Sequence, residues 1–237
     1  MAQHRPLQGR QNRTDRAAAG HGPRHERRLL SALKTHLPIG KLVHATDGQH
    51  DRKRSGVHLI DRTTWDHTDL PDPLGARQEP GPFWITEPTL RLLQRCASLD
   101  LCDTPVIHES WTSGCTEALL EKLRRGLAAA REHAIAGGDE LATEYIKMMY
   151  SKFVSTIGES TSNTEMRRPD WMHIIRSQAF ANLWLKAHKA HTAGLTVVEM
   201  KGTDELHLIG DWQSLWNEGR GLAEVKAKHT YSLGGVK

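Results

Sequence analysis

Two adjacent acids mark the segment from Val197 to Trp212, which reads VVEMKGTDELHLIGDW. Apolar residues on either side of a Gly-Thr-Asp turn predict a β-hairpin with Asp204 and Glu205 at its tip. Neighbouring side chains of an extended segment point to opposite faces, so the two acids need not share one site. From these residues alone, a purely structural turn remains the alternative.

The elements that would hold this hairpin are short strands and longer helices. Apolar periodicity and turn residues predict strands around 42–43, 56–65, 83–86 and 104–112, and helices at about 87–97, 115–135, 139–158 and 169–193. Gly137 and Gly138 end one long helix and Asp139 begins the next, so these two helices form an antiparallel pair. Strand-rich and helical segments in this order predict an α+β fold, with helices packed on an antiparallel sheet.

The composition favours a cytoplasmic globular protein. No apolar run is long enough for a membrane helix, and the first residues lack the apolar centre of a secretory signal. Cys96, Cys102 and Cys115 are few and odd in number, as is usual in a reducing compartment. Their spacing, even with His108 added, matches no usual zinc pattern, so we expect ordinary thiols rather than a metal site.

The positive charge belongs to the N-terminal segment. The net charge of the whole chain is +4, yet residues 1–28 alone hold seven arginines against Asp15 and Glu26. This segment has few large apolar side chains and is predicted to be a disordered basic tail. Its arginines could neutralise nucleic-acid phosphates, and we expect DNA contacts from the first four: Arg5, Arg10, Arg13 and Arg16. A merely solvated tail is the alternative.

Several segments, taken in order, resemble the palm and fingers portion of family B DNA polymerases, in particular the protein-primed phage type. LPIGK (37–41) resembles the segment that follows the family's first catalytic motif, and FWITEPTLRLLQR (83–95) the strand and helix that lead to the fingers. YIKMMYSKFVSTIGES (145–160) resembles the fingers helix. GTDELHLIG (202–210) resembles the last metal-binding hairpin, and SLGGVK (232–237) the segment that closes the palm.

The resemblance implies a palm-like first part at 29–114, a fingers-like helical pair at 115–158 and a palm-like second part at 159–237. It implies template-directed nucleotidyl transfer with Mg²⁺ as cofactor, and primer-template DNA and a dNTP as partners. Asp204 would be the catalytic metal ligand and Glu205 a further metal ligand. The expected nucleotide-binding residues are Arg131, Lys147, Tyr150 and Lys152. Solvated helix charges for Arg131 and Lys147, and a core aromatic for Tyr150, are the alternatives.

Both expected catalytic motifs depart from the family pattern. Pro23 and Arg24 stand near the place of the first catalytic Asp, and Gly202 stands where the hairpin should carry its first Asp. A single remaining Asp cannot hold two Mg²⁺ ions, so we expect a truncated or divergent member of a mobile or linear replicon, with incomplete or impaired activity. A non-catalytic nucleic-acid-binding protein that keeps the polymerase fold is the alternative. An interaction module or decayed gene product is a third.

Overall fold

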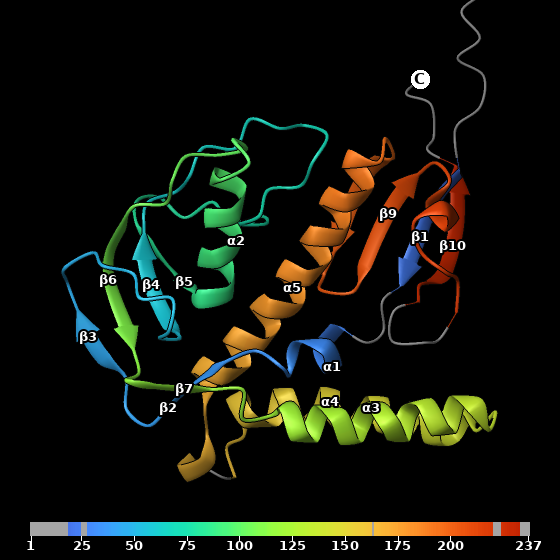
Figure 1. The fold of residues 1–237 in the computed structure, drawn as a ribbon, viewed down its shortest axis with the longest axis horizontal. Helices are drawn as coiled ribbons and strands as arrows, with labels where there is room; N and C mark the ends of the chain where they lie inside the picture. The colour runs from blue at the N-terminus through green and yellow to red at the C-terminus, as the bar shows by residue number, and fades with distance from the viewer. Residues whose placement is uncertain (1–18, 25–27, 163, 220–223, 233–237) are drawn as a thin grey trace, which may run out of the picture.

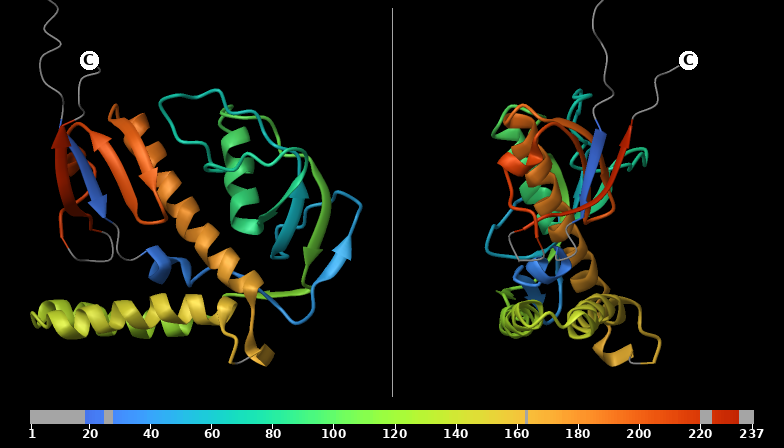
Figure 2. Two further views of the ribbon diagram at one scale, coloured as in Figure 1. Left: turned by 180° about the vertical axis from the view of Figure 1, so that it is seen from behind. Right: turned by 90° about the vertical axis from the view of Figure 1, so that its right-hand side faces the viewer.

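The computed structural model describes residues 19–24, 28–162, 164–219 and 224–232. A long helix, α5 (Pro169–Thr192), crosses the molecule diagonally, with one four-stranded sheet on each side of it (Figure 1). Helices α3 (Glu121–Ala136) and α4 (Glu140–Glu159) lie side by side along one edge, as the end-on view confirms (Figure 2). The fold is therefore α+β, as the sequence predicts.

The first sheet contains the acidic hairpin. Its strand order is β10–β1–β9–β8, and every pairing is antiparallel. The strands are β1 (Ala19–Arg24), β8 (Thr196–Lys201), β9 (Glu205–Ile209) and β10 (Lys226–Ser232). The basic segment at 1–28 is thus not disordered throughout, because residues 19–24 form an inner strand of this sheet. Residues 1–18 and 25–27, with Arg5, Arg10, Arg13 and Arg16, lie outside the described residues.

The second sheet has the order β3–β6–β4–β5 and is also antiparallel. It contains β3 (Val43–Ala45), β4 (Gly56–Ile60), β5 (Phe83–Thr86) and β6 (Ile107–Thr112). Residues along β4 alternate between buried and half-buried, the period that the pattern GVHLI predicts for a strand with one face on the core. Helix α2 (Glu87–Ala97) follows β5 directly and packs on this sheet.

The helical pair begins later than its sequence indicates. The sequence predicts one helix over 115–135, but β7 (Cys115–Glu117) pairs instead with β2 (Leu37–Ile39), and α3 begins at Glu121. The apolar stripe is accordingly divided, with Leu120 and Leu127 buried and Leu119 and Leu123 exposed. The cap of α4 is as predicted, because the Asp139 carboxylate accepts a hydrogen bond of 2.9 Å from the Ala142 N–H.

Helix α5 supplies the centre of the core. Its first half packs Ile174 and Ile175 against α4 and α1 (Arg28–Ala32), while its second half packs Leu183 and Trp184 under the hairpin sheet. Short 3-10 turns occupy Thr164–Met166 and Trp212–Ser214. No helix in the part of the chain that the structure covers is both long and apolar enough to cross a bilayer.

Candidate functional site

The acidic turn joins β8 to β9. Lys201 and Glu205 are the last paired residues of the two strands, and Gly202, Thr203 and Asp204 make the connection. Gly202 has a φ of 60°, in the left-handed region that glycine enters without steric cost. Gly202 stands where the family's hairpin has its first Asp, and glycine is the residue that this backbone conformation favours.

Strand register places charged residues in one row across the sheet. Glu205 is paired with Lys201 on one side and with Arg24 on the other, and Arg24 is paired in turn with Lys226. The row therefore contains one acid, Glu205, and three basic residues. The end of β1, where the family's first catalytic Asp would lie, instead has Pro23 and Arg24.

Glu205 has a partner on its own strand. Its Oε1 lies 3.0 Å from His207 Nε2, and both side chains are almost buried, with 12% and 10% exposed. Residues two apart on a strand share a face, so this contact follows from the register of β9. Leu206 and Leu208 are fully buried in the core on the opposite face. Asp204, in the turn itself, is half-buried.

These residues do not fit a two-metal carboxylate site. Such a site needs several carboxylate oxygens from adjacent strands converging on two ions. Among the described residues of this sheet row and turn, Asp204 and Glu205 are the only acids, Glu205 contacts His207, and Gly202 and Arg24 occupy the remaining expected acid positions. We derive no catalytic step through Mg²⁺ from this geometry.

Two of the four expected nucleotide-binding side chains are buried. Arg131 is 1% exposed and donates from Nη1 to the Thr143 carbonyl oxygen at 3.0 Å, which ties α3 to α4. Tyr150 is also 1% exposed and packs in the core between α4 and α5. Tyr150 thus has the position of the core aromatic that the sequence left open, whereas Arg131 is buried and is not the solvated helix charge given as its alternative.

The other two side chains lie nearer the surface of α4. Lys147 Nζ is 3.3 Å from Glu144 Oε2, an (i, i+3) contact within the helix. Lys152 is exposed and lines an apolar cavity of about 630 Å³ with Phe153, Ile157 and Trp171. No contact in the structure tests nucleotide binding by either lysine.

A buried polar cluster in the second sheet is not among the sites that the sequence predicts. His58 Nε2 lies 2.8 Å, and His50 Nε2 3.1 Å, from Oε2 of Glu87, the first residue of α2. Arg91, one turn later, donates from Nε to Glu87 Oε1 at 2.5 Å. Burial alone would raise the pKa of Glu87, but hydrogen bonds from His50, His58 and Arg91 outweigh burial and lower its pKa to about 2. No spacing motif marks these residues in the sequence.

The cysteines lie apart from this cluster. Cys96 is fully buried, and burial raises the pKa of its thiol to about 12. His108 lies 3.0 Å from Asp61, not against a cysteine, so these residues form no common metal cluster within the described chain.

The antiparallel sheets and the projecting helical pair resemble the fold of solved structures of phi29 DNA polymerase. The ternary complex with primer-template DNA and incoming nucleotide matches with a TM-score of 0.63 and 11% identity. The binary complex with primer-template DNA has a TM-score of 0.60, and the orthorhombic crystal form 0.58 with 9% identity.

These similarities cover 91% of this chain but only 43% of the phi29 enzyme, so the chain spans less than half the length of the polymerase it matches. No protein-family model matches the sequence, and no curated protein is significantly similar to it. At such low identity the comparison establishes the fold, which resembles that of a protein-primed family B polymerase.

Proposed function

We propose that this chain is a DNA polymerase-like protein that binds primer-template DNA through a palm and fingers of the protein-primed family B type. The observation that carries the proposal is the shared fold over 91% of the chain, with the acidic hairpin inside the same sheet as β1. The matched phi29 structures include complexes with primer-template DNA. More specifically, we propose a role in copying the DNA of a mobile or linear replicon.

Charge supports DNA as the partner. Lys201 and Lys226 are exposed at the two ends of the charged row, and Arg24 lies between them in register. Basic residues bind DNA chiefly through its phosphates, with release of condensed counterions. The arginines at 5, 10, 13 and 16 add positive charge to the chain just before β1. We propose that they contact the same DNA.

Nucleotidyl transfer is the activity to test, with Asp204 as metal ligand and Mg²⁺ as the ion. Two-metal chemistry would need carboxylates beyond Asp204 and Glu205. The second candidate is therefore a non-catalytic DNA-binding protein on the same fold. The observation that favours it is the pairing of Glu205 with Arg24, which puts a basic residue where a metal site needs an acid.

The binding experiment measures affinity for a fluorescent primer-template DNA over a range of salt concentrations. Changing Arg5, Arg10, Arg13 and Arg16 together to Gln should weaken binding and reduce the slope of log K against log salt by about 0.9 for each phosphate that the variant no longer neutralises. The matched control replaces the same four residues with Lys, which keeps the charge and should keep the slope. Absent or salt-independent binding by the parent protein would overturn the proposal.

The activity experiment measures primer extension with dNTPs and Mg²⁺ by the parent protein and by Asp204→Ala. The matched control is Asp211→Ala, which removes an exposed acid just beyond the far end of β9. Extension that is abolished only in Asp204→Ala supports the catalytic form of the proposal. Salt-dependent DNA binding without extension by the parent supports the non-catalytic form.

A further inference from the structure

The cluster of His50, His58 and Glu87 brings together three metal-binding side chains from separate elements. His50 lies in the loop between β3 and β4, His58 is on β4, and Glu87 begins α2. One nitrogen or oxygen from each residue lies within 4.8 Å of the others. The side chains are 9%, 1% and 3% exposed, so this is an interior site and not a chance meeting of surface groups.

Both imidazoles contact the Glu87 carboxylate through Nε2. His58 Nε2 lies 2.8 Å from Oε2, and His50 Nε2 lies between the two oxygens, 3.1 Å from Oε2 and 3.2 Å from Oε1. Arg91 donates to Oε1. Tetrahedral ligands about 2.0–2.1 Å from a zinc ion are about 3.4 Å apart. The two His–Glu distances therefore need to lengthen slightly, and the two Nε2 atoms, which lie within 4.8 Å of each other, must reach the same spacing. Arg91 donates to Oε1 and leaves Oε2 to the ion.

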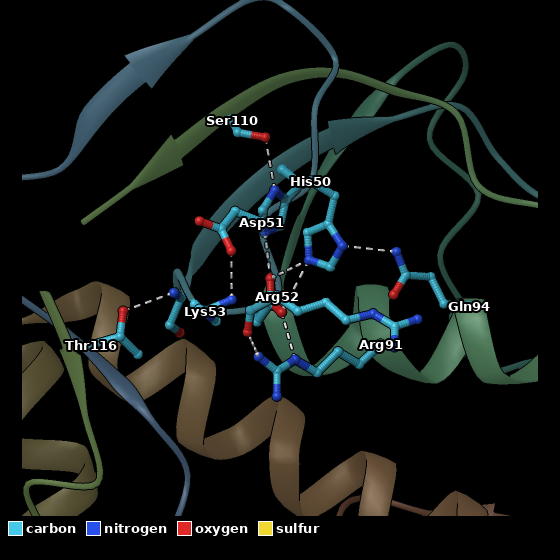
Figure 3. A network of polar contacts seen from close by, with 11 residues as sticks. His50, Asp51, Arg52, Lys53, Arg91, Gln94, Ser110 and Thr116 are labelled. Carbon is cyan, nitrogen blue, oxygen red and sulfur yellow. Dashed lines mark hydrogen bonds and ion pairs between the residues drawn. The ribbon is translucent and has the colours of Figure 1, made fainter. Parts of the chain in front are cut away.

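The second nitrogen of each imidazole is also held. His58 Nδ1 lies 2.8 Å from Ser110 Oγ, and His50 Nδ1 lies 3.0 Å from the Gln94 side-chain amide. Figure 3 shows Gln94 beside the His50 ring, with Arg91 extending to the backbone of Arg52. Metal-binding histidines in proteins are typically oriented by such outer hydrogen bonds.

These outer partners can serve two protonation arrangements. With Nε2–H donating to Glu87, each Nδ1 accepts a hydrogen bond from the Ser110 hydroxyl or the Gln94 amide. With Nε2 bound to a metal, each Nδ1–H donates instead, to the Ser110 oxygen or to the amide oxygen after the Gln94 amide turns over. Hydroxyls and primary amides can both donate and accept, so neither arrangement leaves a buried polar atom without a partner.

We propose that His50, His58 and Glu87 form a zinc site, with Nε2, Nε2 and Oε2 as ligands and a water molecule as the fourth. Two imidazoles and one carboxylate suit Zn²⁺, which accepts nitrogen and oxygen ligands in tetrahedral geometry. The ion takes the place of the Nε2 protons, which pass to Nδ1, and it joins the loop at 46–55, β4 and α2. The site lies in the second sheet, on elements separate from the acidic hairpin.

A cavity of about 340 Å³ adjoins the outer partners of the cluster. Arg91 and Gln94, which contact Glu87 and His50, line it together with Arg52, Arg95 and Ser98. A metal site needs an entry path as well as ligands. None of the three proposed ligands lines this cavity, so an ion would have to pass Arg91 and Gln94 to reach them.

The test titrates Zn²⁺ into chelator-treated protein in competition with a chromophoric zinc indicator. The parent should bind one Zn²⁺ tightly, and Zn²⁺ should raise its thermal midpoint. Glu87→Gln and His50→Gln should each weaken Zn²⁺ binding at least tenfold, and Gln94→Ala about tenfold. The matched control is His108→Gln, which removes a 40%-exposed histidine paired with Asp61 and should leave zinc affinity unchanged.

Two results would overturn the zinc site. One is absence of tight Zn²⁺ binding by the folded parent. The other is equal zinc affinity in the parent, Glu87→Gln and His50→Gln, which would assign the ion to other histidines or thiols. If Glu87→Gln does not fold, the half-buried loop variant His50→Gln still decides, because its thermal midpoint can be read with and without Zn²⁺.

Discussion

Arg24 and Glu205 are direct partners in the antiparallel register of β1 and β9. In a sheet, residues at directly opposite positions are close neighbours. A basic residue is thus paired in register with the acid that follows Asp204. The row holds three basic residues and one acid, a balance of charge that suits an anion better than a metal ion.

Arg24→Asp should convert this pair into two opposed acids. We expect it to lower stability by up to about 1 kcal/mol in metal-free buffer, because like charges directly opposite are destabilising. Millimolar Mg²⁺ should recover part of the loss by bridging the carboxylates. Urea unfolding with and without Mg²⁺ measures both effects. Arg24→Gln, which adds no acid, should show no Mg²⁺ dependence beyond the parent's.

Gly202→Asp should create a divalent-cation site at the turn. A Cβ on Gly202 would lie 3.6 Å from Asp204 Oδ1, an ordinary contact, so a second carboxylate can be placed beside the first. The positive φ of Gly202 costs about 1 kcal/mol with a side chain present, although Asp tolerates it better than most residues. We expect Mn²⁺ affinity, measured by calorimetry, to rise about tenfold.

The control for this gain is Gly202→Asn, which meets the same backbone strain without a charge. It should lower stability to a similar degree and leave Mn²⁺ affinity at the parent's value. An equal gain in both variants would show that the change acts through the turn conformation and not through the carboxylate.

Glu87 should give the protein an acid-sensitive contribution to stability. Its pKa in the folded protein is about 2, below the ordinary 4.5, so the contribution is complete above pH 4.5 and is lost as the pH falls towards 2. The difference between these two pKa values corresponds to about 3 kcal/mol of unfolding free energy. About 2 kcal/mol of this is lost by pH 3. Urea unfolding of the parent and of Glu87→Gln, in zinc-free buffer, should show the gap between them narrowing from pH 6 to pH 3. A constant gap would contradict this account.

Replacing Gly158 or Gly126 with alanine should change the stability of the protein in opposite directions. A Cβ on Gly158 would lie 2.6 Å from the Met172 Cβ, where α4 crosses α5, so Gly158→Ala should cost about 1–3 kcal/mol through overpacking. A Cβ on Gly126 in α3 would meet no described atom within 4 Å, so Gly126→Ala should stabilise the protein by roughly 0.5–1 kcal/mol. Chemical denaturation of the two variants measures both changes in the free energy of unfolding. Two changes of the same sign would contradict the close approach of α4 and α5.

Substitutions of Arg131 and Lys147 should distinguish a packing role from a role in nucleotide binding, because they should affect stability differently. Arg131→Met removes the hydrogen bond to the Thr143 carbonyl and should cost about 1–3 kcal/mol, because buried polar groups lose their partner. Lys147→Met removes an (i, i+3) surface contact with Glu144 and should change stability by no more than about 0.5 kcal/mol. Unfolding measurements test this difference. Loss of dNTP binding in folded Arg131→Met, with stability unchanged, would instead favour a nucleotide role.

Local sequence signals predicted the regular elements well. The helix expected at 87–97 is α2 with the same bounds, and the hairpin around Asp204 is β8 and β9. These elements depend on apolar periodicity, turn residues and caps within a few positions, all of which are visible in the chain. The segment at 115–117 is an exception, because its local pattern predicts a helix. It forms a strand instead, since it pairs with β2, whose residues are nearly 80 positions away.

The candidate site depended on contacts that no local pattern contains. The sequence determined which acids stand in the turn, that Gly202 replaces one of them, and that positive charge gathers before β1. Only the tertiary structure decided that β1 enters the sheet opposite Glu205, that Arg131 and Tyr150 are buried, and that His50, His58 and Glu87 meet. Periodicity shows which face of an element is apolar, but strand register and packing between distant segments determine which polar groups meet.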